Sequence, residues 1–210
     1  MKYLIDTADV NEIRKWKYYV EGVTTNPILL NKINIKSFLE EMDGIKENFN
    51  VFIQVHTLKE YDDLVLIKRT LHLKNNIIAK IPLMYSQGYE LLKKIKEIYK
   101  YNSQMLIPIT GTITYDLIQL HQAFELGCDY CIVLIHKNEN PLFLEEALKL
   151  RKTNSNYNKT KLIGASFRTK DEINRALLSG IQYATLSPKT FKLIFNNEQT
   201  NKDWREIYGN

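Results

Sequence analysis

A lysine stands in the middle of an apolar segment, NIIAKIPLM, at residues 76–84. The rest of the segment is rich in β-branched residues, which is typical of a strand buried on both faces. An isolated buried ammonium is costly unless it is paired or loses its proton. Either Lys80 is charged and pairs with a carboxylate such as Asp6, or it is neutral and attacks a carbonyl carbon. In the second case it forms a Schiff base, which permits cleavage or formation of the adjacent carbon–carbon bond.

Other polar residues follow the ends of apolar segments elsewhere in the chain. They are Asp6, Thr24, Thr25, Asn26, Gln54, His56, Thr110, Thr112, Ser166 and Arg168. Such residues form one site with Lys80 only if the fold brings the ends of several strands together.

Short apolar segments alternate with amphipathic segments along the chain, which predicts alternating strands and helices. We expect strands at residues 2–6, 22–26, 51–55, 77–81, 105–109, 130–135, 161–166 and 183–187. The helical patterns lie at residues 59–73, 86–99, 115–126, 140–152 and 169–180. Eight strand–helix units favour parallel pairing in an α/β fold, a closed (β/α)₈ TIM barrel. A doubly wound open sheet is the alternative, but the chain has neither G-x-G-x-x-G nor a Walker A motif.

Two helix boundaries carry specific signals. Pro141 suits the first turn of the helix at residues 140–152. The helix at 169–180 is expected to begin with Thr169 as its N-cap and to end at Gly180.

No linker or low-complexity segment divides the chain, so we expect one domain over residues 1–210. Residues 1–198 form the barrel in this prediction, and residues 199–210 form a short extra C-terminal helix. Trp204 is expected to dock that helix on the barrel or on another subunit.

The composition favours an ordinary globular protein, with 44% hydrophobic and 25% charged residues. The net charge is +5, but lysines are interspersed with acidic residues, so we expect no nucleic-acid partner. No apolar segment is long enough for a membrane span, and the N-terminus lacks the apolar region of a signal peptide. Cys128 and Cys131 begin an apolar strand, so we interpret them as core residues rather than a redox or metal site, and expect a reducing, cytoplasmic compartment.

The order of the motifs resembles the small transaldolase family, especially its fructose-6-phosphate aldolase branch. The motifs are LIDTADV, GVTTNP, IQV, AKIP, GT and GASFRT, and they extend over essentially the whole chain. The resemblance implies that Lys80 is the Schiff-base lysine and that Asp6 acts as a base in carbon–carbon cleavage. It also implies that Asn26, with Thr25 beside it in the T-T-N-P motif, binds the substrate, and that Thr112 holds a catalytic water.

The GASFRT segment matches the part of the family that contacts the substrate phosphate. The expected contacts are Ser166 and Arg168, because the guanidinium is a planar set of donors and the next helix begins at Thr169. Without the resemblance, the favoured interpretations are a helix-entry residue for Ser166 and a solvated surface charge for Arg168.

Gln54 distinguishes two branches of the family. Transaldolases have a glutamate at this position, whereas the aldolase branch has a glutamine. Because Gln54 cannot exchange a proton, it can only position other groups, and it favours the aldolase branch.

The sixth strand departs from the family pattern, which has an aromatic residue followed three positions later by an arginine. The aldolase branch uses a tyrosine there as an acid/base, but this chain has Leu134 and then Lys137. Lys137 keeps a positive charge for the phosphate without the bidentate geometry of arginine. His136, His56 and Tyr85 are candidates for the missing proton handler, and the sequence does not choose among them.

The leading hypothesis is a class I aldolase that needs no metal or cofactor and acts on a ketose phosphate such as fructose 6-phosphate. The alternatives are a transaldolase that transfers a dihydroxyacetone unit, and a sugar-phosphate-binding homologue with low activity. The resemblance also implies a ring-type homo-oligomer that assembles through the C-terminal helix.

Overall fold

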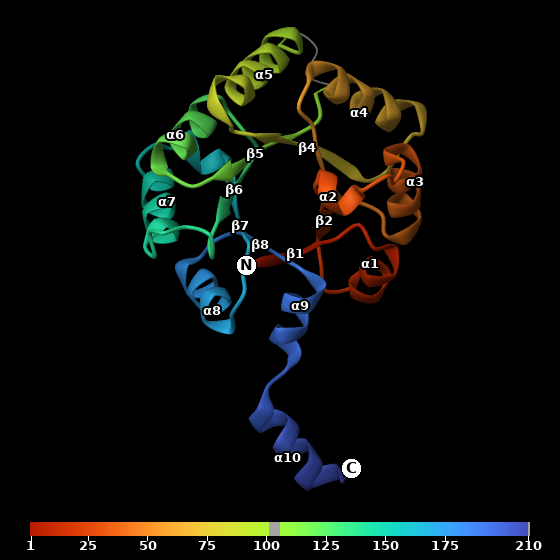
Figure 1. Ribbon diagram of the computed structural model, residues 1–210, viewed down its shortest axis with the longest axis vertical. Coiled ribbons are helices and arrows are strands. Elements are labelled where there is room, and N and C mark those ends of the chain that lie inside the picture. The colour runs from red at the N-terminus through yellow and green to blue at the C-terminus, as the bar shows by residue number, and fades with distance from the viewer. Residues whose placement is uncertain (101–105, 210) are drawn as a thin grey trace.

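The computed structural model describes residues 1–100 and 106–209, and these residues form a closed barrel of eight parallel strands. Each strand pairs with the next, and β8 (Tyr183–Leu186) returns to pair with β1 (Lys2–Asp6). Figure 1 looks down this ring and shows helices covering its outside. The predicted (β/α)₈ fold is therefore confirmed.

The six other strands lie close to their predicted positions, except β5. They are β2 (Gly22–Thr24), β3 (Asn50–Gln54), β4 (Asn76–Pro82), β5 (Ile109–Thr114), β6 (Tyr130–Leu134) and β7 (Lys161–Ala165). The helices are α1 (Val10–Trp16), α2 (Pro27–Leu30), α3 (Ile35–Ile45), α4 (Leu58–Thr70), α5 (Tyr85–Ile98), α6 (Leu117–Glu125), α7 (Phe143–Lys152), the 3₁₀ helix η2 (Tyr157–Lys159), α8 (Lys170–Ser179), α9 (Pro188–Phe195) and α10 (Glu198–Tyr208).

The prediction for the fifth strand was wrong. We expected residues 105–109, but the strand begins at Ile109 and continues to Thr114; Met105 is outside the described residues. The parallel register joins Ala79 to Ile109, so pairing with β4 begins where the apolar segment ends. The true strand, ITGTIT, is rich in threonine and does not look like a buried strand.

Helix boundaries were predicted with mixed success. Thr169 caps α8 through a capping box, and Gly180 ends it in a left-handed conformation, as expected. Pro141, however, precedes α7 rather than entering its first turn, because that helix begins at Phe143.

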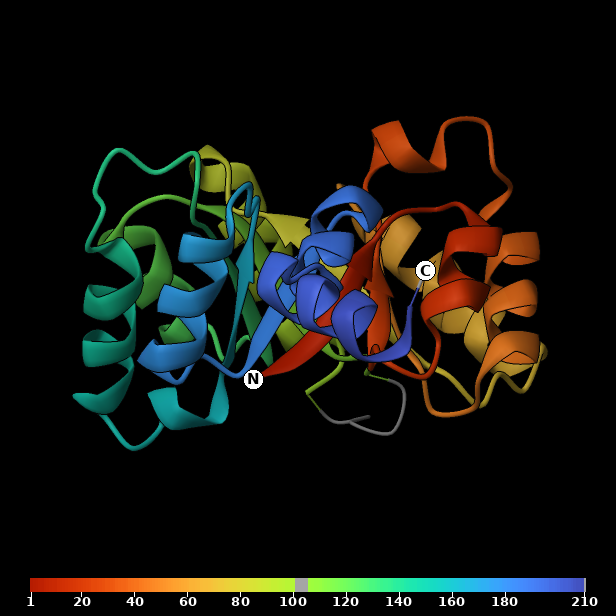
Figure 2. The same cartoon turned by 90° about the horizontal axis from the view of Figure 1, so that it is seen from below.

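The strands have a two-residue period that separates an apolar layer inside the barrel from a polar layer above it. Leu4 and Asp6 on β1 illustrate the period, as do Phe52 and Gln54 on β3. The apolar layer consists of Leu4, Phe52, Ile78, Tyr130, Ile132, Ile163, Ala165 and Tyr183. A larger apolar cluster fills the space between strands and surrounding helices. The apolar layer therefore fills the lower part of the barrel, and the polar layer lies toward the carboxyl ends of the strands. Figure 2 shows the barrel from the side, with the helices around the strands.

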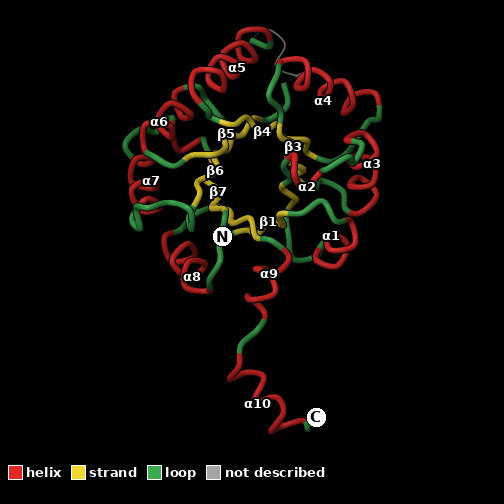
Figure 3. The backbone as a smooth tube through the Cα atoms, in the orientation of Figure 1, coloured by secondary structure: helices red, strands yellow, loops and turns green. Residues whose placement is uncertain are grey.

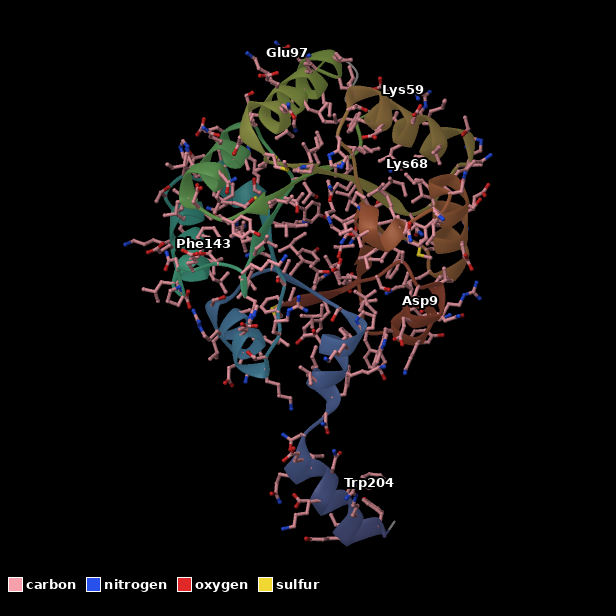
Figure 4. The ribbon with its side chains drawn as sticks, in the orientation of Figure 1. Asp9, Lys59, Lys68, Glu97, Phe143 and Trp204 are labelled. Carbon is pink, nitrogen blue, oxygen red and sulfur yellow. The ribbon has the colours of Figure 1, made fainter. Side chains whose placement is uncertain are left out.

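The last helix, α10, extends away from the barrel, as Figures 1 and 3 show. None of its described residues is buried, and Trp204 is 60% exposed. Figure 4 places this tryptophan well outside the ring of strands. The predicted C-terminal helix exists, but Trp204 does not dock it on its own barrel.

Cys128 and Cys131 are buried and unpaired, and burial raises the pKa of both thiols, that of Cys131 to about 12. This agrees with their interpretation as core residues rather than reactive thiols. In the described part of the chain, no helix is long and apolar enough to cross a membrane.

Candidate active site

A cavity of about 600 Å³ opens at the carboxyl ends of the strands and collects the predicted site residues. All of them line it except Thr25: Asp6, Asn26, Gln54, Lys80, Thr112, Lys137, Ser166 and Arg168. These residues come from seven strands or the loops that follow them. The cavity also includes Thr24, Thr185 and Ser187, and its apolar wall contains Ile132, Leu134 and Phe167.

Lys80 lies on β4 at the base of this cavity and is only 6% exposed. Its Nζ atom donates a 2.6 Å hydrogen bond to the backbone carbonyl oxygen of Thr25. Among the described residues, no carboxylate lies within ion-pair distance of it. Burial lowers the pKa of Lys80 to about 8, against a smaller opposing effect of the Asp6 charge. A neutral amine is therefore available near neutral pH.

Asp6 ends β1 and accepts a hydrogen bond from a threonine on the neighbouring strand β2. Thr24 on β2 donates a 2.6 Å hydrogen bond to Asp6 Oδ1, and its hydroxyl lies 2.7 Å from that of Thr185 on β8. This arrangement engages one carboxylate oxygen and leaves the other for the cavity. Asp6 is thus a positioned carboxylate near Lys80 rather than its ion-pair partner.

Asn26 and Thr25 follow β2 and serve different purposes. The Asn26 side-chain oxygen accepts hydrogen bonds from the backbone N–H groups of Ile28 and Leu29 and so caps α2. Its amide nitrogen remains a donor for a ligand. The Thr25 hydroxyl donates to the carbonyl oxygen of Phe52, so Thr25 contacts Lys80 through its backbone and does not line the cavity.

Gln54 ends β3 directly beside Lys80, its register partner on β4. The Gln54 amide nitrogen lies 3.1 Å from Nε2 of His56. The backbone N–H of His56 donates to Glu60, which belongs to the capping box of α4. A short chain of contacts therefore joins the start of α4 to a side chain in the cavity.

Thr112 and Ile113 are the residues of β5 that line the cavity. Thr112 lines the cavity beside Pro82, its register partner on β4. Beyond it the register with β6 shifts, and Ile113 takes a positive φ of 63°. Such irregularities often re-aim strands near active sites. A hydroxyl in this position can hold a water molecule beside the lysine.

Ser166 lies at the opening between β7 and α8 and has two unusual features. Its φ is +66°, a strained value for a residue with a side chain, and its hydroxyl oxygen is buried with no hydrogen-bond partner among the described residues. Arg168 follows it, and the start of α8 at Thr169 comes next. A donor hydroxyl, a guanidinium and a helix N-terminus suit an anion such as a phosphate.

The candidate proton handlers occupy different surroundings. His136 turns away from the cavity and pairs with Glu172, with 2.7 Å between Nδ1 and Oε1, and Glu172 also accepts from the Arg168 backbone N–H. His56 instead contacts Gln54, which lines the cavity. Leu134 lines the cavity and packs against the apolar layer. The side chain of Tyr85 is outside the described part of the structure.

Thr185 and Ser187 also line the cavity but were not among the predicted site residues. Both lie at the end of β8, where the two-residue period already placed Thr185 on the inside. The closure of the barrel places Thr185 near the end of β1, because β8 must lie beside β1, and its hydroxyl contacts that of Thr24, the donor to Asp6. Ser187 lines the cavity but also caps α9.

The family model described as Transaldolase/Fructose-6-phosphate aldolase matches residues 3–208. The chain belongs to this family. All the residues that line the cavity lie within the matched range.

Relatives in the family carry both of its activity names. A probable fructose-6-phosphate aldolase from Streptococcus pneumoniae is 26% identical over 93% of this chain and 89% of its own length. A probable transaldolase from Thermoplasma volcanium is 27% identical over 99% of this chain and 96% of its own. Identities of this size do not separate the two activities.

More distant solved structures share the barrel. The crystal structure of KGPDC from Streptococcus mutans superposes with a TM-score of 0.64 at 10% identity, covering 88% of this chain and 86% of that one. The YdjI aldolase from Escherichia coli K12 superposes with a TM-score of 0.57 at 14% identity, covering 88% and 74%. At these identities the likeness shows the fold alone.

Proposed function

We propose that the chain is a class I aldolase that cleaves or forms a ketose phosphate such as fructose 6-phosphate. The observation that carries the proposal is the buried Lys80, with a lowered pKa and no ion-pair partner among the described residues, at the base of a cavity in a family named for this chemistry. Gln54, where the resemblance leads us to expect a glutamate in a transaldolase, supports the aldolase assignment.

The proposed reaction begins when neutral Lys80 attacks the ketone carbon of the substrate. The resulting carbinolamine loses water and becomes an iminium ion. Asp6 then accepts the proton of the C4 hydroxyl, the C3–C4 bond breaks, and its electron pair moves into the iminium to give an enamine. The aldehyde fragment leaves. Protonation of the enamine and hydrolysis by a water near Thr112 release dihydroxyacetone and restore Lys80.

Binding of the phosphate is assigned to the opening between β6, β7 and α8. Ser166 supplies an unpartnered hydroxyl, Arg168 a planar set of donors, and Lys137 a second positive charge. Asn26 is assigned to a substrate hydroxyl through its amide nitrogen. Thr25 contributes in this proposal through its carbonyl contact to Lys80.

Chemical trapping tests the Schiff base directly. The protein is incubated with fructose 6-phosphate or dihydroxyacetone, reduced with borohydride, digested and mapped by mass. We expect the adduct on Lys80 and none in Lys80→Met. Absence of an adduct in the correctly folded wild type contradicts the proposal.

Two alternatives make different predictions. A transaldolase, the name of several relatives, requires an aldose acceptor such as erythrose 4-phosphate for turnover, whereas an aldolase releases free dihydroxyacetone. A binding homologue of low activity, suggested by Leu134 in place of an acid/base residue, forms the Lys80 adduct with negligible steady-state turnover.

The exposed α10 supports a homo-oligomer in which this helix contacts a neighbouring copy. Its tryptophan and adjacent apolar side chains have no partner within their own barrel among the described residues. The two unpaired, buried cysteines fit the cytoplasm that we propose as the compartment.

A further inference from the structure

Ile113, on β5, has a strained backbone conformation. Its φ is +63°, in the left-handed region that a β-branched residue rarely adopts. Among the described residues, the other non-glycine residues with a positive φ are Ser166, which also lines the cavity, and Lys32, Asn48 and His72 in exposed turns. Strain of this kind persists only where the surrounding structure imposes it, and it often occurs at functional sites. Ile113 lines the cavity, so its strain lies at the candidate site rather than in a surface turn.

The irregularity at Ile113 changes which residues of β5 face the cavity. Side chains alternate between the two faces of a regular strand, so Thr112 and Thr114 should both point inward. Instead, Thr112 and Ile113 both line the cavity. The register with β6 shifts before Thr114, whose hydroxyl lies 3.3 Å from Sγ of Cys131 in the apolar cluster outside the strands. The shift thus removes a hydroxyl from the cavity and puts an apolar residue in its place.

Ile113 continues an apolar surface that covers one side of the cavity. The other residues of this surface are Ile132 and Leu134 on β6 and Ala165 on β7, and we call the four residues the β5–β7 wall. The three strands are consecutive in the ring that Figure 1 shows, so their lining residues are neighbours. None of the four side chains can donate or accept a hydrogen bond.

Polar side chains that suit substrate hydroxyls lie on the other side of the cavity. Asp6 and Gln54 end β1 and β3, and Asn26 follows β2. Thr112 is the cavity-lining hydroxyl of β5, and its register partner is Pro82 on β4, toward Lys80. A hydroxyl that faces the β5–β7 wall instead loses its water without gaining a partner, which is unfavourable.

A substrate bound as proposed passes along the β5–β7 wall. Its carbonyl carbon meets Lys80 on β4, and its phosphate is assigned to Lys137 and Arg168, which follow β6 and β7. β5 and β6 lie between these two ends of the substrate on the shorter way around the ring. In the aldehyde that adds to the dihydroxyacetone unit, the carbon next to the carbonyl therefore lies against Ile113 and Leu134. Glyceraldehyde 3-phosphate carries a hydroxyl on this carbon.

We propose that Ile113 is a specificity-determining residue, and that the β5–β7 wall selects an aldehyde phosphate with no hydroxyl next to its carbonyl. The inference rests on the proposed function and names the class of aldehyde that reacts there. Its simplest member is 3-phosphooxypropanal. The enamine carbon attacks the aldehyde carbon, the aldehyde oxygen takes a proton from Asp6, and water hydrolyses the iminium. The product is a 5-deoxyhexulose 6-phosphate, and Lys80 is regenerated.

Initial rates with dihydroxyacetone and each of two aldehydes test this preference in the wild-type protein. The aldehydes are 3-phosphooxypropanal and D-glyceraldehyde 3-phosphate, which differ by one hydroxyl, so contacts to the phosphate cancel in the ratio of their kcat/KM values. We expect a ratio of about 10 to 100 in favour of 3-phosphooxypropanal, because an apolar pocket disfavours an added hydroxyl by up to about 100-fold. A ratio near one, or a preference for glyceraldehyde 3-phosphate, overturns the proposal.

Variants of Ile113 separate the wall from the intrinsic reactivity of the two aldehydes, which is the same for every protein. Asparagine tolerates a positive φ and brings a donor and an acceptor to the wall, so Ile113→Asn should lower the ratio about 10-fold. Ile113→Val keeps the wall apolar and should keep the ratio. His72→Asn changes an exposed residue with a φ of 50° after α4 and is the matched backbone control, which should also keep it. An unchanged ratio in Ile113→Asn overturns the proposal.

Binding of two unreactive alcohols tests the wall without turnover and without a variant. The alcohols are 3-hydroxypropyl phosphate and glycerol 3-phosphate, which differ by the same hydroxyl and have no carbonyl group for Lys80. Calorimetry with the wild-type protein should give a Kd about 10-fold lower for 3-hydroxypropyl phosphate. Equal Kd values, or no binding of either alcohol, overturn the proposal. Absence of a Lys80 adduct with dihydroxyacetone contradicts the proposed function instead, and this measurement still decides what the wall selects.

Discussion

The side-chain nitrogen of Lys80 donates a 2.6 Å hydrogen bond to the backbone carbonyl oxygen of Thr25, two strands away along the barrel. A single neutral acceptor does not compensate a fully charged ammonium for the loss of water. The carbonyl orients the amine, and burial still lowers its pKa to about 8. A nucleophilic lysine requires this kind of contact. The carbonyl oxygen orients the amine but does not stabilise the ammonium form enough to keep the lysine protonated.

Lys80→Met should stabilise the fold while abolishing the Schiff base. The folded pKa of Lys80 lies below the unfolded value of 10.5, so the unfolded chain binds more protons between about pH 8 and 10.5. Wild-type stability therefore rises with pH across this window relative to the variant. The free energy of unfolding of Lys80→Met should exceed that of the wild type most below pH 8. The expected difference is roughly 3 kcal/mol, at 1.36 kcal/mol per unit by which folding lowers the Lys80 pKa. Urea unfolding at pH 7 and 10 measures it; an equal difference at both pH values contradicts the prediction.

Asp6→Asn should separate the two tasks of this carboxylate. The Asp6 charge raises the pKa of Lys80, so its removal lowers that pKa further and moves the pH midpoint of Schiff-base formation below 8. Cleavage should fall by about 10²-fold or more because the base is lost. Rates of borohydride trapping and of turnover, measured from pH 6 to 10, report the two effects. A midpoint that moves upward contradicts the role given to the Asp6 charge.

Most strands were predictable because a barrel strand is apolar on its outer face and, in its lower half, on its inner face as well. The fifth strand was not, since its inner positions, Thr110 and Thr112, face the cavity end and its outer Gly111 leaves room for Leu83. A search for apolar segments therefore selected the residues that precede it. The direction of α10 could not be predicted either. Its sequence does not indicate whether its apolar face packs against its own barrel or against another chain.

The site was predictable where chemistry and strand position agree, as for Lys80, Asp6 and Gln54. Contacts between side chains were not, because they depend on which residues become neighbours after folding. The support of Asp6 by Thr24 and Thr185 follows only from the closure of β8 against β1. The different contacts of His56 and His136 likewise depend on the positions of Gln54 and Glu172 after folding.

Leu134→Tyr tests whether the missing hydroxyl limits the reaction. Leu134 lines the cavity and is only partly buried, so a phenol ring has access to the cavity from this position. We expect turnover of fructose 6-phosphate to rise at least about 10-fold, within the range of general acid–base effects. Leu134→Phe is the matched control, because it adds the ring without the hydroxyl and should leave turnover near the wild-type rate. Equal rates for both variants show that proton transfer here does not limit turnover.

The exposed face of α10 predicts an assembly that depends on its apolar side chains. Trp204, Ile207 and Tyr208 are all more than half exposed, and the rings of Trp204 and Tyr208 lie 4.2 Å apart between centroids. Replacing Trp204 and Ile207 together by serine should lower the mass seen by sedimentation, since burial of these side chains is lost. Lys202→Ser, on the same helix, is the control and should keep the wild-type mass. A wild-type monomer contradicts the expected oligomer.

Lys137→Arg should improve recognition of the phosphate without changing the chemistry. The lysine supplies charge at the cavity opening, but an arginine adds a planar pair of donors that matches two phosphate oxygens. We expect KM for fructose 6-phosphate to fall several-fold and kcat to stay within about two-fold.

Arg168→Ala should have the opposite effect and raise KM about 10-fold or more, because a charge-assisted hydrogen bond contributes about 1.5–3 kcal/mol. Dihydroxyacetone, which has no phosphate, is the internal control: its rate of Schiff-base trapping should be the same in both variants and the wild type. If the rate of dihydroxyacetone trapping changes as much as KM does, Lys137 and Arg168 act near Lys80 and not at the phosphate, which contradicts the prediction.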